Sequence, residues 1–442
     1  MSAVAWALVA HFLLATALLV SNGHYHVVPG TLVLLSCAAA GGALIGAPFP
    51  GGVSTGRARA LALFLALAFT VAAFLRKPGD FVSTSLVPYY ALSACAVGLV
   101  ASYARETRAG TSRGDRLATL RPYAMLVVAF ALGAWMLHAS PSPRIDVWPI
   151  HQQGAQALLA GRSPYEAGAV ATNDTFISHD GKVIATYGYP PTNVLLTAAA
   201  YALTGETRWA VLVAIVASAY LLWRLARRSA QPGAPWPDLL LACFLFHPRG
   251  LFVLEEAWGD PLALPFLAGF ALAVTTGRRR AAAVLLGLLC SVKQHFAIYG
   301  VVLAFAPGIG VSGALLALAI TAATYLPFAI ASPQGVWLAL VQFHAKGAFR
   351  ADSLSLTAMV ARAGFVLPSW VGLAATLSFF VVLPWIPRRL GALLTASVVA
   401  FFLFYLLGRQ AFCNYYYVVG QTLLLAAAAL ASEPSAPGTQ SR

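Results

Sequence analysis

The residues best suited to chemistry lie in one long polar segment between Arg144 and Leu196, RIDVWPIHQQGAQALLAGRSPYEAGAVATNDTFISHDGKVIATYGYPPTNVLL. This segment is the longest polar interruption in a chain of apolar runs, and Asp146 stands just past one of those runs. Long loops on a rigid scaffold are where functional residues concentrate. Asp146 is therefore the first candidate for a catalytic carboxylate.

Carboxylates, cations and aromatic side chains also occur between the later apolar runs. The candidates are Glu255, Glu256, Asp260, Lys293, His295, Lys346, Arg350, Asp352, Arg409 and Asn414, with His151, Tyr165, Tyr187 and Tyr189 in the first segment. A carboxylate can accept the proton of an attacking hydroxyl, and cations can stabilise the charge on a departing phosphate. The set indicates a reaction between a hydroxyl and a phosphate-linked group, with one base and one cationic clamp.

The composition defines the scaffold that must position these residues. Of 442 residues, 60% are apolar and only 10% are charged, whereas a soluble domain has roughly 45–50% apolar and about 25% charged residues. The chain is therefore expected to be an all-α, polytopic integral membrane protein. Its partners would include membrane lipids.

The charge distribution argues against a nucleic-acid-binding protein, and the cysteine positions argue against a disulfide framework or a metal site. The net charge of +14 arises from basic residues spread over short loops, without the basic stripe of a nucleic-acid-binding surface, so no nucleic acid is expected as a partner. The five cysteines stand singly in apolar stretches. We interpret them as small core residues, with no disulfide framework and no metal site.

Apolar runs long enough to cross a bilayer predict about fourteen helices. The candidate spans are 3–21, 30–47, 58–75, 86–104, 122–138, 208–224, 238–254, 261–276, 281–293, 295–306, 313–331, 368–386, 390–407 and 415–431. The segment 190–204 is interpreted as an interfacial helix, because the arginine clusters then all fall on one side. Basic loops face the cytoplasm, which places Asp146 on the outer face of the plasma (inner) membrane.

This pattern divides the chain into four parts. Residues 1–104 form an N-terminal four-helix membrane extension, and 105–121 form a basic cytoplasmic loop. Residues 122–431 form the membrane core, with the outer loop 139–206. A disordered cytoplasmic tail, 432–442, follows.

Two neighbouring motifs resemble a known family. DVWPIHQQGAQALLAGRSPY, residues 146–165, followed by YGYPP, residues 187–191, looks like the first outer loop of GT-C polyprenyl-phosphate-dependent glycosyltransferases, especially glycosyltransferase family 87. The later pieces EEAWGDPLAL, SVKQ, RADSLSL and RQAFCNYY, which begin at residues 255, 291, 350 and 409, also fit. The resemblance covers about residues 122–431. In that family the Asp loop commonly follows the first span, whereas here about four spans precede it.

The resemblance implies transfer of a sugar from a polyprenyl-phosphate donor to a lipid-linked or glycan hydroxyl on the outer face. Mannose and arabinofuranose are the sugars it favours. It implies that Asp146 is the general base, and it leaves the need for a divalent cation open. It assigns Lys293, Arg350 and Arg409 to phosphate binding. We expect Tyr165, Tyr187 and Tyr189 to shape the sugar pocket. The other substrate-binding candidates are His151, Glu256, Asp260 and His295.

Each residue also has a purely structural interpretation. Asp146 could cap a helix, as could the acids at 255, 256 and 260. Lys293 could extend to the membrane interface, and Arg350 could form a surface ion pair with Asp352. The tyrosines at 415–417 are interpreted as an interfacial aromatic belt rather than a sugar platform.

Two other functional classes stay open. Many helices with Gly and Pro breaks also suit a transporter or flippase. A glycan polymerase or ligase would use arginine or histidine on a large outer loop, so a dispensable Asp146 would favour it.

Overall fold

Helices make up most of the described part of the chain. The computed structural model describes residues 2–49, 55–109, 116–166, 168–170, 186–230 and 236–433. Part of the basic loop 105–121, part of the outer loop 139–206 and the tail from 434 lie outside the described residues. Within the described ranges there is no strand, and the one isolated bridge joins His24 to Ser353. The all-α prediction is confirmed.

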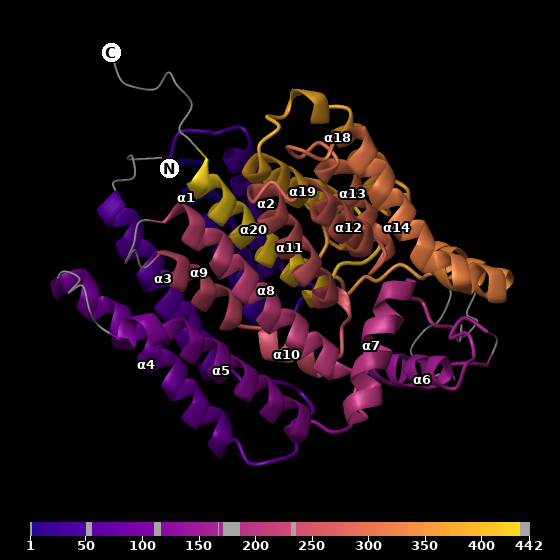
Figure 1. The fold of residues 1–442 in the computed structure, drawn as a ribbon, viewed down its shortest axis with the longest axis horizontal. Coiled ribbons are helices and arrows are strands. Elements are labelled where there is room, and N and C mark those ends of the chain that lie inside the picture. Colours follow the sequence, from indigo (N-terminus) through magenta and orange to yellow (C-terminus); the bar gives the residue numbers. More distant parts are fainter. Residues whose placement is uncertain are drawn as a thin grey trace.

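Figure 1 shows the order of the helices. In order they are α1 (Ser2–Ser21), α2 (Val27–Leu44), α3 (Thr55–Leu75), α4 (Val87–Ala109), α5 (Arg116–Ala139), α6 (Val147–Leu159), α7 (Pro191–Thr204), α8 (Arg208–Ser229), α9 (Trp236–Leu245), α10 (Gly250–Glu255), η1 (Asp260–Ala263), α11 (Leu264–Thr275), α12 (Arg279–Cys290), η2 (Gln294–Phe296), α13 (Ala297–Leu303), α14 (Gly310–Ala331), α15 (Pro333–Trp337), the π-helical η3 (Leu338–Gln342), α16 (Phe343–Lys346), α17 (Leu356–Arg362), α18 (Val371–Phe380), η4 (Leu383–Trp385), α19 (Leu390–Leu406) and α20 (Cys413–Ser432).

Six of the described helices are long and apolar enough to cross a membrane. They are Ser2–Ser21, Val27–Leu44, Thr119–Ala139, Arg208–Arg228, Gly310–Ala331 and Cys413–Ser432, and seven further apolar helices have only 10–17 residues. Every expected span overlaps a helix. The structure therefore supports an all-helical membrane protein with six helices of spanning length, and the count of fourteen crossings stays a prediction.

One expected span was predicted wrongly, because it forms two helices instead of one. The range 238–254 is divided, because α9 ends at Leu245 and α10 begins at Gly250. Pro248 lies between them. Proline has no backbone N–H and disfavours helical geometry in the residue before it, so the break falls there. The segment expected at the interface does form a helix, α7, which ends at Gly205 with φ of 74°.

The core is built around α20, which lies among α1, α8 and α19 (Figure 1). In its apolar window 78% of the residues are buried, against 11% for α14, so α20 is a central helix and α14 is a peripheral one. His11 of α1 contacts the carbonyl oxygen of Gly420 through Nδ1 at 2.9 Å. The N-terminal helices thus pack directly on the C-terminal helix of the core.

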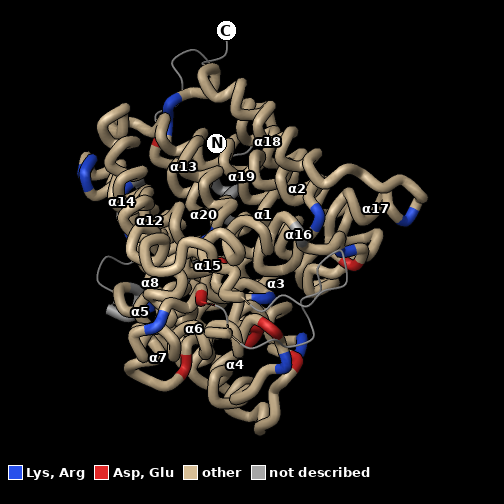
Figure 2. The backbone as a smooth tube through the Cα atoms, turned by 90° about the vertical axis from the view of Figure 1, so that its right-hand side faces the viewer, with Lys and Arg blue, Asp and Glu red and all other residues tan. Residues whose placement is uncertain are grey.

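Connections far apart in sequence meet at the end of the bundle that carries Asp146, named here the Asp146 end. The N–H of Tyr25 donates to the carbonyl of Asp352 at 2.8 Å, and that of Leu354 donates to Ala411 at 2.9 Å. In Figure 2 most of the red acidic segments lie in the half with α4, α6 and α7. The opposite, arginine end carries Arg279 and Arg388.

Candidate functional site

Asp146 stands at the start of α6. Its Oδ1 accepts a hydrogen bond from the N–H of Val147 at 2.9 Å, and its side chain is only partly buried. Burial raises the pKa of Asp146 above its usual value; hydrogen bonds, chiefly from Val147, and the charge of Arg350 oppose this rise. Asp146 therefore caps the start of α6, as the structural interpretation of the sequence allowed. A carboxylate with a raised pKa is a stronger base.

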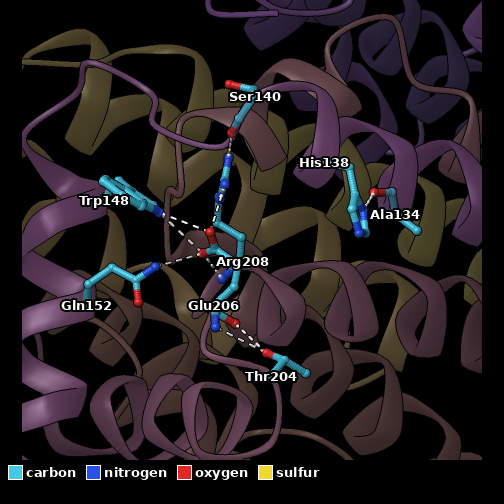
Figure 3. Close-up of polar contacts among 8 residues, drawn as sticks. All are labelled: Ala134, His138, Ser140, Trp148, Gln152, Thr204, Glu206 and Arg208. Atoms are coloured by element: carbon cyan, nitrogen blue, oxygen red, sulfur yellow. Dashed lines mark hydrogen bonds and ion pairs between the residues drawn. The ribbon is translucent and has the colours of Figure 1, made fainter. Parts of the chain in front are cut away.

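A polar cluster around Glu206 holds α6 in place (Figure 3). The carboxylate of Glu206 accepts from Trp148 Nε1 at 3.2 Å, from Gln152 Nε2 at 3.1 Å and from an Arg208 Nη at 2.7 Å. Arg208, which is 1% exposed, also donates to the carbonyl of Ser140 at 2.9 Å. The cluster thereby ties the first turns of α6 to the α7–α8 turn and to the end of α5.

The aromatic residues of the first segment form a packed layer. Tyr187 and Tyr165 are 0% and 1% exposed, and the Tyr165 hydroxyl donates to the carbonyl of Tyr189 at 2.7 Å. His151 contacts the Tyr187 hydroxyl through Nδ1 at 3.2 Å, and that hydroxyl donates to Asn193 Oδ1 at 3.0 Å. The two buried tyrosines therefore pack behind Tyr189. Tyr189 is the tyrosine of this group that a ligand can contact, because it is partly exposed.

His151 is uncharged at neutral pH. Burial, with a smaller contribution from the charge of Lys293, lowers its pKa to about 3. Its ring centroid lies 4.6 Å from that of Tyr189. Because the Tyr187 hydroxyl already donates to Asn193, His151 donates to it from Nδ1, and its Nε2 is a buried acceptor without a hydrogen-bond partner among the described residues.

Asp260 joins three elements of the core. It accepts from Lys293 Nζ at both carboxylate oxygens, each at 2.8 Å, and from Asn414 Nδ2 at 2.7 Å. His295 Nε2 lies 3.9 Å from Oδ1. The carboxylate of Asp260 is therefore engaged by side chains from the α12–η2 connection and from α20. Helix capping does not account for these contacts.

Lys293 is buried and paired. It is 5% exposed, and its Nζ lies 4.5 Å from the ring centroid of Tyr415 and 5.7 Å from that of Tyr189. Burial alone would lower the pKa of Lys293, but Asp260 and Tyr415 outweigh it and the pKa is raised. The interpretation that Lys293 extends to the interface is wrong. Its partner is a carboxylate, and its third N–H remains for another acceptor.

The adjacent glutamates have different roles. Glu255 is 0% exposed and accepts from the N–H groups of Asp80 and Phe81, the latter at 3.0 Å, so it anchors the α3–α4 connection. Burial and the charges of Glu255, Asp80 and Asp146 raise the pKa of Glu256 to about 8, against a small opposing effect of Arg249. Glu256 is therefore protonated at neutral pH and can donate a hydrogen bond.

Arg350 and Arg409 are both engaged in this structure. Arg350 forms a bidentate pair with Asp352, with N–O distances of 2.9 and 2.8 Å, and both side chains are 46% exposed. This is the surface ion pair that the sequence allowed. Arg409 donates to the carbonyls of Ala345 and Gly347 at 2.7 and 2.9 Å. It organises the loop that carries Arg350.

Sequence reasoning missed several contributors. Glu206 and Arg208 stand as two charges between two apolar helices, which was the available signal. Asn414 was a candidate, but its contact with Asp260 was not predicted. His344 was not considered, yet its Nε2 lies 2.9 Å from the carbonyl of Gly188, beside Tyr189. The aromatic-belt interpretation is wrong, because Tyr416 and Tyr417 are 0% exposed and Tyr415 faces Lys293.

No group of three or more His, Cys, Asp or Glu side chains that could hold a metal ion occurs within the ranges that the structure describes.

Comparison with known proteins gives no relative, since no family model, no curated protein and no solved structure matches the chain. The described part of the chain is all-helical, has six helices of membrane-spanning length, and carries a cluster of charged and aromatic side chains at one end.

Proposed function

We propose that the protein is a membrane glycosyltransferase of the GT-C type, resembling glycosyltransferase family 87. It would transfer a sugar, mannose or arabinofuranose, from a polyprenyl-phosphate donor to a lipid-linked or glycan hydroxyl. In this proposal the helices make about fourteen crossings, the Asp146 end faces outward from the plasma membrane, and residues 1–104 are an added module.

The observation that carries the proposal is the arrangement around Tyr189. Burial raises the pKa of Tyr189 well above its usual value, and the charges of Asp146 and Asp260 add to this rise. Lys293 lies 5.7 Å from the same ring. A cation paired with an acid therefore lies beside one partly exposed aromatic ring, and the charge of the candidate base also acts on that ring. Such a ring is a surface on which a sugar can stack.

The proposed reaction uses these groups in a single displacement. Asp146 takes the proton of the acceptor hydroxyl, whose oxygen attacks the anomeric carbon with inversion. The bond from that carbon to the phosphate oxygen breaks, and the electron pair stays on the phosphate. The free N–H of Lys293 and the guanidinium of Arg350 stabilise the resulting charge. For this, Arg350 must exchange Asp352 for the phosphate.

Unsatisfied polar atoms support a polyhydroxylated ligand. His151 Nε2, Asn193 Nδ2 and His295 Nε2 are buried, and the structure gives them no hydrogen-bond partner within its described part. Buried polar atoms in native proteins are normally hydrogen-bonded. Sugar hydroxyls both donate and accept, so they can satisfy acceptors and donors of this kind.

The test is sugar transfer by membranes that contain the chain, with radiolabelled polyprenyl-phosphate mannose and, separately, the arabinofuranose donor. Asp146→Asn keeps the size of the side chain but cannot accept the proton, so transfer should fall roughly 100-fold or more. Glu166→Gln, an exposed acid of the same segment, is the matched control and should transfer normally. Normal transfer by Asp146→Asn would remove Asp146 from the chemistry. Assays with and without EDTA decide the need for a divalent cation.

One observation favours the alternative of a transporter or flippase. The helix break between α9 and α10 contains Arg249, which is 2% exposed, and broken helices with buried charge are typical of transporters. Absence of transfer from either donor, together with lipid movement across vesicles containing the protein, would establish this alternative. Transfer that needs Arg350 or His151 but not Asp146 would favour a glycan polymerase or ligase.

A further inference from the structure

A cavity lined by arginines and apolar residues lies at the arginine end, away from Asp146. Its volume is about 1080 Å³, and it is lined by Arg279, Arg280 and Arg388 with the apolar side chains of Phe305, Ile309 and Val311. None of the described residues that line it is acidic. Three guanidinium groups around one open cavity favour an anionic occupant, because Arg presents several donors to phosphate oxygens.

Backbone donors add to this positive charge. The first turn of α14, Gly310 to Gly313, lines the cavity. Its N-cap, Ile309, supplies no side-chain hydrogen bond, so the first N–H groups of this 22-residue helix have no acceptor within the helix. Gly308, with φ of 82°, lies against the side chain of Arg279, where a Cβ would come within 3.2 Å. The glycine thus allows Arg279 to lie close to the turn.

Exposed apolar side chains of α14 continue from the cavity along the helix. Val311 lines the cavity and is 78% exposed, and Leu315 and Leu318 farther along α14 are 60% and 64% exposed. These side chains belong to the helix of spanning length with the smallest buried share, 11%. An occupant can therefore place an anionic group among the arginines and apolar chains along α14.

Arginines that only determine membrane orientation need not surround a shared cavity. Here Arg279 and Arg280 belong to α12, whereas Arg388 follows η4 about a hundred residues later in the chain, so tertiary folding brings them together. We propose that this cavity binds the phosphate headgroup of an anionic membrane phospholipid. The site is independent of the proposed transfer reaction at the Asp146 end.

The test uses the full chain purified in detergent, with dioleoyl-phosphatidylglycerol as the probe and dioleoyl-phosphatidylcholine as the neutral control. Native mass spectrometry should show preferential retention of phosphatidylglycerol. In the variant Arg279→Gln/Arg388→Gln this preference should fall roughly tenfold, because charge-assisted hydrogen bonds to the phosphate are lost. Arg279→Lys/Arg388→Lys keeps the charge and should retain most of it. Arg228→Gln, an exposed arginine outside the cavity, is the matched control and should bind as the wild type does.

Three results would overturn the proposal. Equal retention of the two lipids would show that no anionic headgroup is selected. An equal loss in Arg228→Gln would show a diffuse charge effect without a site. Thermal stabilisation by inorganic phosphate as large as that by phosphatidylglycerol, abolished in the Arg279→Gln/Arg388→Gln variant, would make the occupant a soluble phosphate compound instead of a lipid.

Discussion

Lys293 and Asp260 form a buried ion pair in which one ammonium group donates to both oxygens of one carboxylate, each at 2.8 Å. The two side chains are 7% and 1% exposed. They come from segments on either side of α11 and α12, and Asn414 of α20 completes the contact. The pair therefore links the middle of the chain to its C-terminal helix, and its cation lies beside the rings of Tyr189 and Tyr415.

Removing one member of this pair should destabilise the protein. Lys293→Met leaves the Asp260 carboxylate buried without its cation, which costs about 3–5 kcal/mol. The double variant Lys293→Met/Asp260→Asn removes both charges and should recover most of that loss. Thermal unfolding in detergent measures both. If the single and double variants are equally unstable, the ion pair is not the cause.

Glu206→Gln should disturb α6 and, through it, Asp146. The substitution removes the anion of the buried Arg208 and weakens the contacts to Trp148 and Gln152, at an expected cost of about 3 kcal/mol. If Glu206 acts as a positioning residue, kcat of sugar transfer should fall while KM for the donor changes little. Thr204→Val is the matched control, because Thr204 contacts the backbone of Glu206 and not its carboxylate. A proportional rise in KM would contradict a positioning role.

Glu256 should make stability depend on pH. Its pKa is raised from 4.5 to about 8 in the folded protein, so between these values the folded state keeps a proton that the unfolded state has lost. The contribution of Glu256 to the free energy of unfolding is therefore greatest below pH 4.5. It falls as the pH rises and levels off above about 8. Glu256→Gln should remove this component. Thermal unfolding from pH 5 to 9 measures the stability of both proteins. If wild type and variant depend on pH in the same way, Glu256 is not the source of the pH dependence.

Gly79→Ala should loosen the link between the N-terminal helices and the core. A Cβ at Gly79 would overlap the carboxylate of Glu255, which holds the α3–α4 connection. Forcing an extra methyl group into a packed site costs roughly 1–3 kcal/mol. Gly98→Ala, in α4 with nothing within 4 Å of the added atom, is the control and should be neutral or slightly stabilising. Equal effects of the two changes would exclude the Glu255 contact as the cause.

The helices themselves were predictable from local pattern. Apolar runs of membrane length can bury their backbone polar groups only as helices, so each expected span overlaps a helix. Asp146 could be singled out for a similar reason, since a lone carboxylate after such a run stands out. Pro248 was visible too, but a continuous apolar run conceals a helix break, and 238–254 was expected as one span.

The partnerships of the charged side chains were decided only by tertiary structure. Lys293 and Asp260 are 33 positions apart, and Asp260 and Asn414 are 154 apart. No local rule relates such positions, because side-chain contacts depend on how the helices pack. For the same reason the sequence could single out Lys293 as a candidate cation, whereas packing selected Asp260 as its partner. It was also packing that placed Glu206 beneath α6 and brought Arg388 to the arginines of α12.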